Sequence, residues 1–326
     1  MSFLNVVLPL GSSVLSFVFA GLVFEQWWHR RQSFQLVWTV GLLWYGISAG
    51  TEFLGGAFGW NELIYRVWYL IGAFFVAAYL GMGTIYLLAK TRFGYFAGVT
   101  VLIGGVLSLL FSRLSLYPGS GAAGTIAFVI AAIGGVAIIV ATAVRRPLAA
   151  HLTLAVLLVG SAAVAYMTLS ASLPAPGWAV DPGTHVPVGS AYPGYLRVLT
   201  GPFNIAGALC LVFGAVYSAY VYMPKKRVLP VRLGVLAIVP NFIASVPGAV
   251  NALFRGRLNS RVPATLLIAL GAFIPGVTSG LNRFGVTWSF YLGEFLGLVL
   301  IFAGFIVSEE VFRTFRFGLG LRRAET

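Results

Sequence analysis

The sequence predicts an all-α, polytopic membrane protein. The chain has 326 residues, of which 59% are hydrophobic and only 9% charged, and its mean hydropathy is +0.94. A soluble domain carries about 25% charged residues, so this chain has too few polar residues to cover a water-facing surface. Apolar stretches of about 20 residues recur along it, and each is long enough to cross the hydrocarbon of a bilayer.

Apolar runs bounded by basic or turn-forming residues predict nine transmembrane helices in order along the chain. Basic pairs separate alternate spans at Arg30 and Arg31, at Lys90 and Arg92, and at Arg145 and Arg146. The predicted spans are 6–27, 34–56, 66–89, 94–112, 122–143, 150–171, 198–222, 263–282 and 286–308.

A tenth apolar stretch, 233–254, is predicted to be broken or re-entrant. It contains Pro240, Asn241, Ser245 and Pro247, and a proline removes a backbone hydrogen bond that nothing in hydrocarbon replaces. The Pro-Gly pair at 247–248 recurs at 275–276 in the next span. This pattern is typical of discontinuous helices that expose their ends to a ligand, or of two helices that are merely kinked.

The distribution of basic residues predicts an outside N-terminus and a cytoplasmic C-terminus. With nine crossings and 233–254 not crossing, 17 of the 21 lysines and arginines fall on the cytoplasmic side, as the positive-inside rule requires. Only Arg66, Arg113, Arg197 and Arg283 fall outside. The net charge of +13 therefore indicates contact with anionic lipid headgroups rather than with a nucleic acid.

Two regions follow from this topology. Residues 1–223 form a predicted seven-helix transmembrane unit, and residues 224–326 contain the 233–254 segment, two further transmembrane helices and a basic cytoplasmic tail. The longest connection, 172–195, lies outside and contains five prolines. We leave two interpretations open for it, a lid over an outward-facing cavity or a stiff connector.

The sequence lacks the residues that most catalytic and cofactor sites require. The three histidines, at 29, 151 and 185, lie at membrane edges or in a loop, so no span offers an axial haem ligand. Cys210 is the only cysteine and Asp181 the only aspartate, which argues against a disulfide framework and against a metal centre. We predict no catalytic residues, no metal site and no cofactor.

The candidate ligand-binding residues are ionisable or polar side chains within or beside the predicted spans. Glu294 lies roughly 12 Å inside the last span at 1.5 Å per residue, where an acidic residue costs about 2.5–3.5 kcal/mol on insertion scales. It therefore needs a partner or a wet cavity. The full predicted set gathers toward the outer leaflet and comprises Glu294, Glu52, Arg66, Tyr69, Arg197 and Arg283.

A structural role is open for each of these residues. Glu62 and Arg66 are four residues apart on one helix and can pair locally. Glu52 can extend toward the interface, and Arg283 can bind headgroups. Tyr45 lies one heptad before Glu52 and shares its helical face. An outward-facing polar pocket with Glu294 at its floor is the sharpest hypothesis.

The second and third spans resemble a known family. Trp38, Trp44 and Glu52, followed by Arg66 and the run Tyr69 to Gly72, are similar to the seven-helix N-terminal sensor region of membrane histidine kinases. The resemblance implies an outside N-terminus and a ligand-sensing role. The chain departs from that family because it has no kinase output domain and adds two further spans.

The sequence favours a transporter, or a protein that handles lipids or small molecules, in a prokaryotic plasma membrane, and disfavours an enzyme. Two alternatives stay open: a sensor that signals through a separate partner, and a structural subunit of a membrane complex. The expected partners are membrane lipids, a small-molecule or lipid ligand, and a protein at the cytoplasmic tail. No nucleic-acid partner is expected.

Overall fold

A computed structural model describes residues 3–230, 235–255, 258–259 and 261–308. Across these ranges the chain is helical, and its only extended pairing is a single bridge between Val180 and Pro187. The basic tail predicted beyond residue 308 lies outside the described residues, as does Arg232.

Eight helical spans in the described ranges are long and apolar enough to cross a membrane, which is the architecture of a multi-pass α-helical membrane protein. They agree with the predicted spans to within a few residues at most ends. The eight are α1 (Leu4–Arg30), α3 to α4 (Glu62–Leu87), α5 (Phe93–Arg113), α6 (Ala123–Val144), α7 (Arg146–Ser170), α8 to α9 (Gly194–Tyr222), α11 (Arg261–Arg283) and α12 (Phe290–Val307).

The remaining predicted span, α2 (Ser33–Phe58), is 26 residues long but less apolar than the others. It packs along α1 on one side and along α4 on the other. Its polar residues are turned inward, because Thr39, Ser48, Thr51 and Glu52 are all buried. A helix that faces other helices rather than lipid needs less hydrophobic surface, which explains the lower hydropathy of α2.

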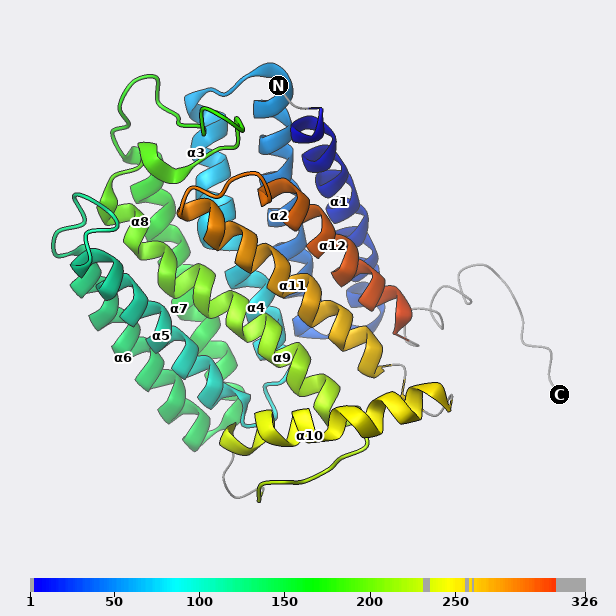
Figure 1. Cartoon of the computed structure of the whole chain (residues 1–326). Helices are drawn as coiled ribbons and strands as arrows, with labels where there is room; N and C mark the ends of the chain where they lie inside the picture. Colours follow the sequence, from blue (N-terminus) through cyan, green and yellow to red (C-terminus); the bar gives the residue numbers. More distant parts are fainter. Residues whose placement is uncertain (1–2, 231–234, 256–257, 260, 309–326) are drawn as a thin grey trace.

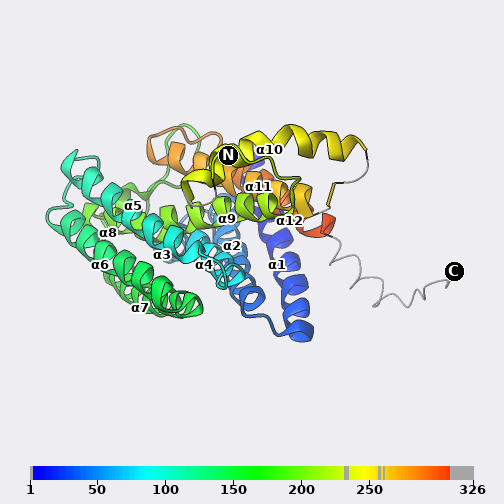
Figure 2. The same cartoon turned by 90° about the horizontal axis from the view of Figure 1, so that it is seen from below.

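Six helical spans form a closed ring. Going around it, α1 contacts α2, α2 contacts α4, α4 contacts α9, α9 contacts α11, α11 contacts α12, and α12 returns to α1. The helices α5, α6 and α7 pack outside the ring on one side, as Figures 1 and 2 show. The predicted regions 1–223 and 224–326 therefore contribute to the same bundle, since α11 and α12 complete the ring.

Two of the ring spans contain a π-helical turn. The first, η1 (Ile71–Phe75), joins α3 (Glu62–Leu70) to α4 (Val76–Leu87), and the second, η3 (Gly201–Ile205), joins α8 (Gly194–Thr200) to α9 (Ala206–Tyr222). The two π turns contact each other. A π turn widens the helix and redirects the residues that follow it, and such turns are frequent at functional sites.

Glycine allows the closest helix contact in the ring, between α4 and α9. A Cβ added at Gly81 would lie 2.4 Å from the Gly207 carbonyl oxygen, and one at Gly207 would lie 2.3 Å from the Ala77 carbonyl oxygen. Only hydrogen side chains permit this approach, as is usual for packed transmembrane helices. The predicted small-residue face at Ala131 and Gly135 packs in the same way, against Gly105 and Gly98 of α5.

The segment predicted to be broken or re-entrant is instead one helix, α10 (Val235–Phe254), which contains both Pro240 and Pro247. It lies across the lower end of the bundle in Figure 1. The polar residues of α10 bind the chain that precedes it. Asn241 Oδ1 accepts hydrogen bonds from the backbone N–H groups of Val228 and Leu229, at 2.7 and 2.8 Å. Ser245 Oγ accepts one from the backbone N–H of Lys226, at 2.9 Å. The second Pro-Gly pair, at 275–276, likewise lies inside the continuous helix α11.

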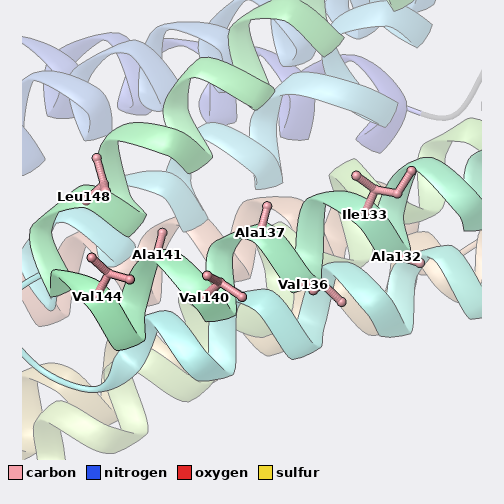
Figure 3. A pocket seen from close by; sticks show the side chains of 8 residues that line it. All are labelled: Ala132, Ile133, Val136, Ala137, Val140, Ala141, Val144 and Leu148. Carbon is pink, nitrogen blue, oxygen red and sulfur yellow. The ribbon is translucent and has the colours of Figure 1, made fainter.

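A shallow surface depression lies on α6 and the start of α7. Eight aliphatic side chains line it, from Ala132 to Leu148 (Figure 3). It contains no ionisable or hydrogen-bonding side chain. Its aliphatic lining is suited to contact with acyl chains.

Candidate ligand-binding site

A polar cavity of about 240 Å³ lies inside the ring, near the end that carries the N-terminus. We call this the central cavity. Its walls come from α2, α3, η1, α8, η3, α11 and α12, and from residues 188–190 of the long loop. Five of the six residues predicted to bind a ligand line it: Glu52, Tyr69, Arg197, Arg283 and Glu294.

The floor of the central cavity holds a pair of carboxyl groups. Glu52 is 1% exposed, and its Oε1 accepts a 2.8 Å hydrogen bond from the Trp68 indole. Its Oε2 has no hydrogen-bond partner in the described residues, and the Glu294 carboxyl lines the same cavity. Two neighbouring carboxyl groups can be joined by a hydrogen bond when one of them carries a proton, so Glu52 is the candidate partner for Glu294.

Helix geometry explains how this pair forms. Side chains on an α-helix tilt toward its N-terminus, and α12 enters the bundle from the N-terminal end of the ring, so the Glu294 side chain points back toward that end. There Glu52 projects from α2. One heptad earlier on α2, Tyr45 donates a 2.8 Å hydrogen bond to the Glu294 carbonyl oxygen. The shared face of Tyr45 and Glu52 therefore contacts Glu294 at two points.

Two half-buried arginines also line the central cavity. The Arg197 guanidinium stacks over the Tyr117 ring, with its Cζ 4.3 Å from the ring centroid, and Arg283 ends α11. In the part of the chain that the structure describes, neither forms a salt bridge. Guanidinium groups that line a cavity and form no salt bridge are suited to binding a carboxylate or phosphate.

The loop between α7 and α8 closes the cavity from above. Val188, Gly189 and Ser190 line it directly, and the Tyr65 hydroxyl donates a hydrogen bond to the Val188 carbonyl. The same loop is tied to the connection between α11 and α12, where the Thr184 and Thr287 hydroxyls lie 2.6 Å apart. The loop thus lines the cavity, and both interpretations, a lid or a stiff connector, stay open for it.

A second cavity of about 220 Å³ shares Tyr117, Asn204, Ser279 and Arg283 with the central cavity. We call it the side branch. It runs between α5 and α11, and its other walls are largely apolar and include Phe111, Leu116, Ile205 and Phe284. Leu116 and Phe284 are 43% and 67% exposed, so the branch reaches the outer surface of the bundle.

Arg66 is the predicted site residue that does not line the cavity. Its guanidinium pairs with Glu62 at 2.6 Å and donates to the carbonyl oxygens of Thr168, Leu169 and Ala171 at the end of α7. These carbonyls have no partner further along their own helix. Arg66 therefore caps α7 and joins it to α3, and the local Glu62–Arg66 pair expected from their spacing is present.

Sequence reasoning missed several residues of the site. Trp68 is not among the residues predicted to bind a ligand, yet it lines the cavity, donates to Glu52 and is 7% exposed. Asn204 lines both cavities. It stands in an apolar span two residues after Pro202, and that combination of a polar residue with the nearby helix-weakening Gly201 and Pro202 was an available signal.

The described residues contain no cluster of three or more His, Cys, Asp or Glu side chains that could hold a metal ion. The site thus offers two carboxyl groups, two guanidinium groups and aromatic walls. This set suits reversible binding of a polar or charged small molecule.

Comparison with known protein families, with curated proteins and with solved structures found no match for this chain. The fold and the site define its class, a multi-pass α-helical membrane protein with a polar cavity enclosed by a ring of helices.

Proposed function

We propose that this protein binds a small molecule or lipid in the central cavity and transports or otherwise handles it across a prokaryotic plasma membrane. The observation that carries the proposal is the convergence of Glu52, Glu294, Arg197 and Arg283 on one enclosed space. These residues come from four different helices and are far apart in sequence. Ionisable side chains at membrane depth are costly, and their usual role is in a substrate or ion pathway.

The same proposal includes nine crossings, with α2 as the ninth, and an outside N-terminus. In the described part of the chain, the ends of helices on the α10 side carry the basic residues Arg30, Arg31, Lys90, Arg92, Arg145, Arg146, Lys225, Lys226 and Arg227. The opposite end carries Arg66, Arg113, Arg197 and Arg283. The positive-inside rule supports a cytoplasmic position for α10 and an outward-facing cavity.

The test is native mass spectrometry of the gently purified protein, with wild type compared with Glu294→Gln. Glu25→Gln is the matched control, because Glu25 is exposed on α1 and remote from the cavity. We expect wild type and Glu25→Gln to retain a small molecule or lipid that Glu294→Gln loses. Equal adducts on all three proteins, or none on any, would contradict the proposal.

Flux measurements in proteoliposomes separate transport from the alternatives. Movement of the retained molecule that stops in Glu294→Gln supports transport. Retention without flux supports a sensor, as the resemblance of the second and third spans to kinase sensor regions suggests. A chain that is unstable alone and purifies with a protein partner supports a structural subunit.

A further inference from the structure

We infer that the ligand is an anionic amphiphile, with its headgroup in the central cavity and its hydrocarbon chain in the side branch. The inference rests on the proposed function, because it names the class of molecule that the same cavity binds. It follows from the different chemistry of two cavities that share Arg283 and Tyr117.

The charge of the central cavity favours an anionic headgroup. Of its two carboxyl groups, Glu52 accepts a hydrogen bond from Trp68, and neither forms a salt bridge with Arg197 or Arg283 in the described chain. Its two guanidinium groups have no carboxylate partner in the described chain. A phosphate or carboxylate group between Arg197 and Arg283 would supply the missing acceptors, and guanidinium groups match such anions in shape and charge.

The size of the central cavity limits what it can hold. Pockets for drug-sized ligands measure about 300–1,000 Å³, and this cavity measures about 240 Å³. It is therefore large enough for a headgroup and too small for a headgroup with a long chain. Any chain must leave through an opening, and the adjacent side branch shares Arg283 as a wall.

The walls of the side branch match a hydrocarbon chain. Phe111, Ile205 and Phe284 provide apolar surface between α5 and α11, and Phe284 extends to the outside of the bundle. The exposed lining residues Leu116 and Phe284 follow the ends of α5 (Phe93–Arg113) and α11 (Arg261–Arg283), so we place the mouth of the branch at the outer edge of the membrane-spanning region, beside the outer leaflet. An amphiphile can enter sideways from the leaflet while its headgroup moves between the arginines.

Glycines in the branch make this route testable. Gly280 lines the side branch but not the central cavity, and a Cβ added there meets no atom within 4 Å. Leucine at this position can therefore fill the branch without disturbing helix packing. Gly134 on α6 is the matched control, because it also has open space around it and lines neither cavity.

The experiment measures binding to the purified full chain in a neutral detergent, with three probes: monododecyl phosphate, inorganic phosphate and dodecyltrimethylammonium. The variants are Arg283→Gln and Gly280→Leu. The controls are Gly134→Leu and Arg113→Gln, the second being an exposed arginine outside both cavities. We expect monododecyl phosphate to bind at least about tenfold more tightly than phosphate, a difference of about 1.4 kcal/mol. We expect Arg283→Gln and Gly280→Leu each to weaken the binding of monododecyl phosphate about tenfold, and we expect the two controls to leave it unchanged.

Inorganic phosphate distinguishes failure of this inference from failure of the proposed function. The binding of inorganic phosphate should be weakened by Arg283→Gln and unaffected by Gly280→Leu, because phosphate needs only the headgroup site. If phosphate binds with this dependence but the dodecyl ester binds no more tightly, the anion-binding site is supported and the inference that the ligand is an amphiphile is wrong. Tighter binding of the dodecyl cation would also overturn it. No binding of any probe, together with a bare chain in native mass spectrometry, would refute both.

Discussion

The Tyr45 hydroxyl donates a 2.8 Å hydrogen bond to the backbone carbonyl of Glu294, two hundred and forty-nine positions away in the sequence. The bond joins α2 to α12 directly below the carboxyl pair. It fixes the height of Glu294 relative to Glu52, which projects from the same face of α2. The position of the deepest carboxyl group in the cavity is therefore set by a residue of the second helix.

Removal of this bond should loosen the α2–α12 contact. We expect Tyr45→Phe to lower the free energy of unfolding by about 0.5–1.5 kcal/mol, the usual value of one such bond. Thermal unfolding in detergent measures the change. Tyr166→Phe is the control, since Tyr166 is 75% exposed on α7. Equal stability of Tyr45→Phe and wild type would show that the bond contributes nothing.

Trp68 is expected to matter through its indole N–H rather than through its bulk. Trp68→Phe keeps an aromatic ring but removes the donor to Glu52 Oε1. A buried acceptor left without a donor costs about 1–3 kcal/mol, so this variant should unfold at a lower temperature. Trp288→Phe, at a position that is 72% exposed, should behave like wild type. The idea is wrong if both tryptophan variants lose the same stability.

Arg66 should affect stability and not ligand retention. Arg66→Gln loses the pair with Glu62 and the charge-assisted bonds to the end of α7. Hydrogen bonds to charged groups contribute about 1.5–3 kcal/mol each, so we expect a loss of at least about 2 kcal/mol in unfolding free energy. Native mass spectrometry should still find the retained molecule. If a stably folded Arg66→Gln variant loses that molecule, Arg66 contributes to ligand binding after all.

The close contact of α4 with α9 predicts a severe effect of a single methyl group. Gly207→Ala would place a Cβ against the Ala77 carbonyl, and overpacking of this kind typically costs about 1–3 kcal/mol. Gly134→Ala has open space and should be neutral. Unfolding in detergent compares the two, and an unchanged Gly207→Ala would mean that α4 and α9 separate at little cost.

The loop between α7 and α8 should respond to acid through Asp181. Hydrogen bonds from the Thr184 backbone and hydroxyl, and from the Gly183 backbone, lower the pKa of this carboxyl below its usual value. A lowered pKa in the folded state means that the ionised form stabilises the loop. That contribution is complete above the unfolded pKa of about 4 and is lost as the pH falls through the folded pKa.

Hydrogen exchange of residues 172–193 at decreasing pH measures this effect, after correction for the intrinsic exchange rate. Wild type should lose protection below about pH 4, whereas Asp181→Asn should show weaker protection with little pH dependence. His185→Asn serves as the control for the neighbouring titratable group, since asparagine tolerates the left-handed backbone found at position 185. If Asp181→Asn still loses protection at low pH, the acid sensitivity of the loop comes from another titratable group.

Much of the fold was predictable because each transmembrane helix is a continuous apolar run, and such runs read directly from the sequence. The need of Glu294 for a partner was predictable from its depth. Its pairing with Glu52 was not, because helical periodicity gives the face of a residue and not the helix that it meets. The continuity of α10 through its two prolines was not predictable for a related reason: Asn241 and Ser245 bond to the backbone of residues 226–229, a tertiary contact that a local pattern does not contain.

The ring also has a consequence for biosynthesis. Arg283 and Glu294 lie on the last two described helices of the chain, whereas Glu52, Tyr69 and Arg197 lie on helices that the ribosome delivers earlier. Until α11 and α12 are inserted, the early helices have an open seam between α1 and α9, and the Glu52 carboxyl has no acidic neighbour. Nascent or truncated chains that stop short of α12 thus contain no finished cavity, and a membrane quality-control protease could recognise them by that uncovered seam.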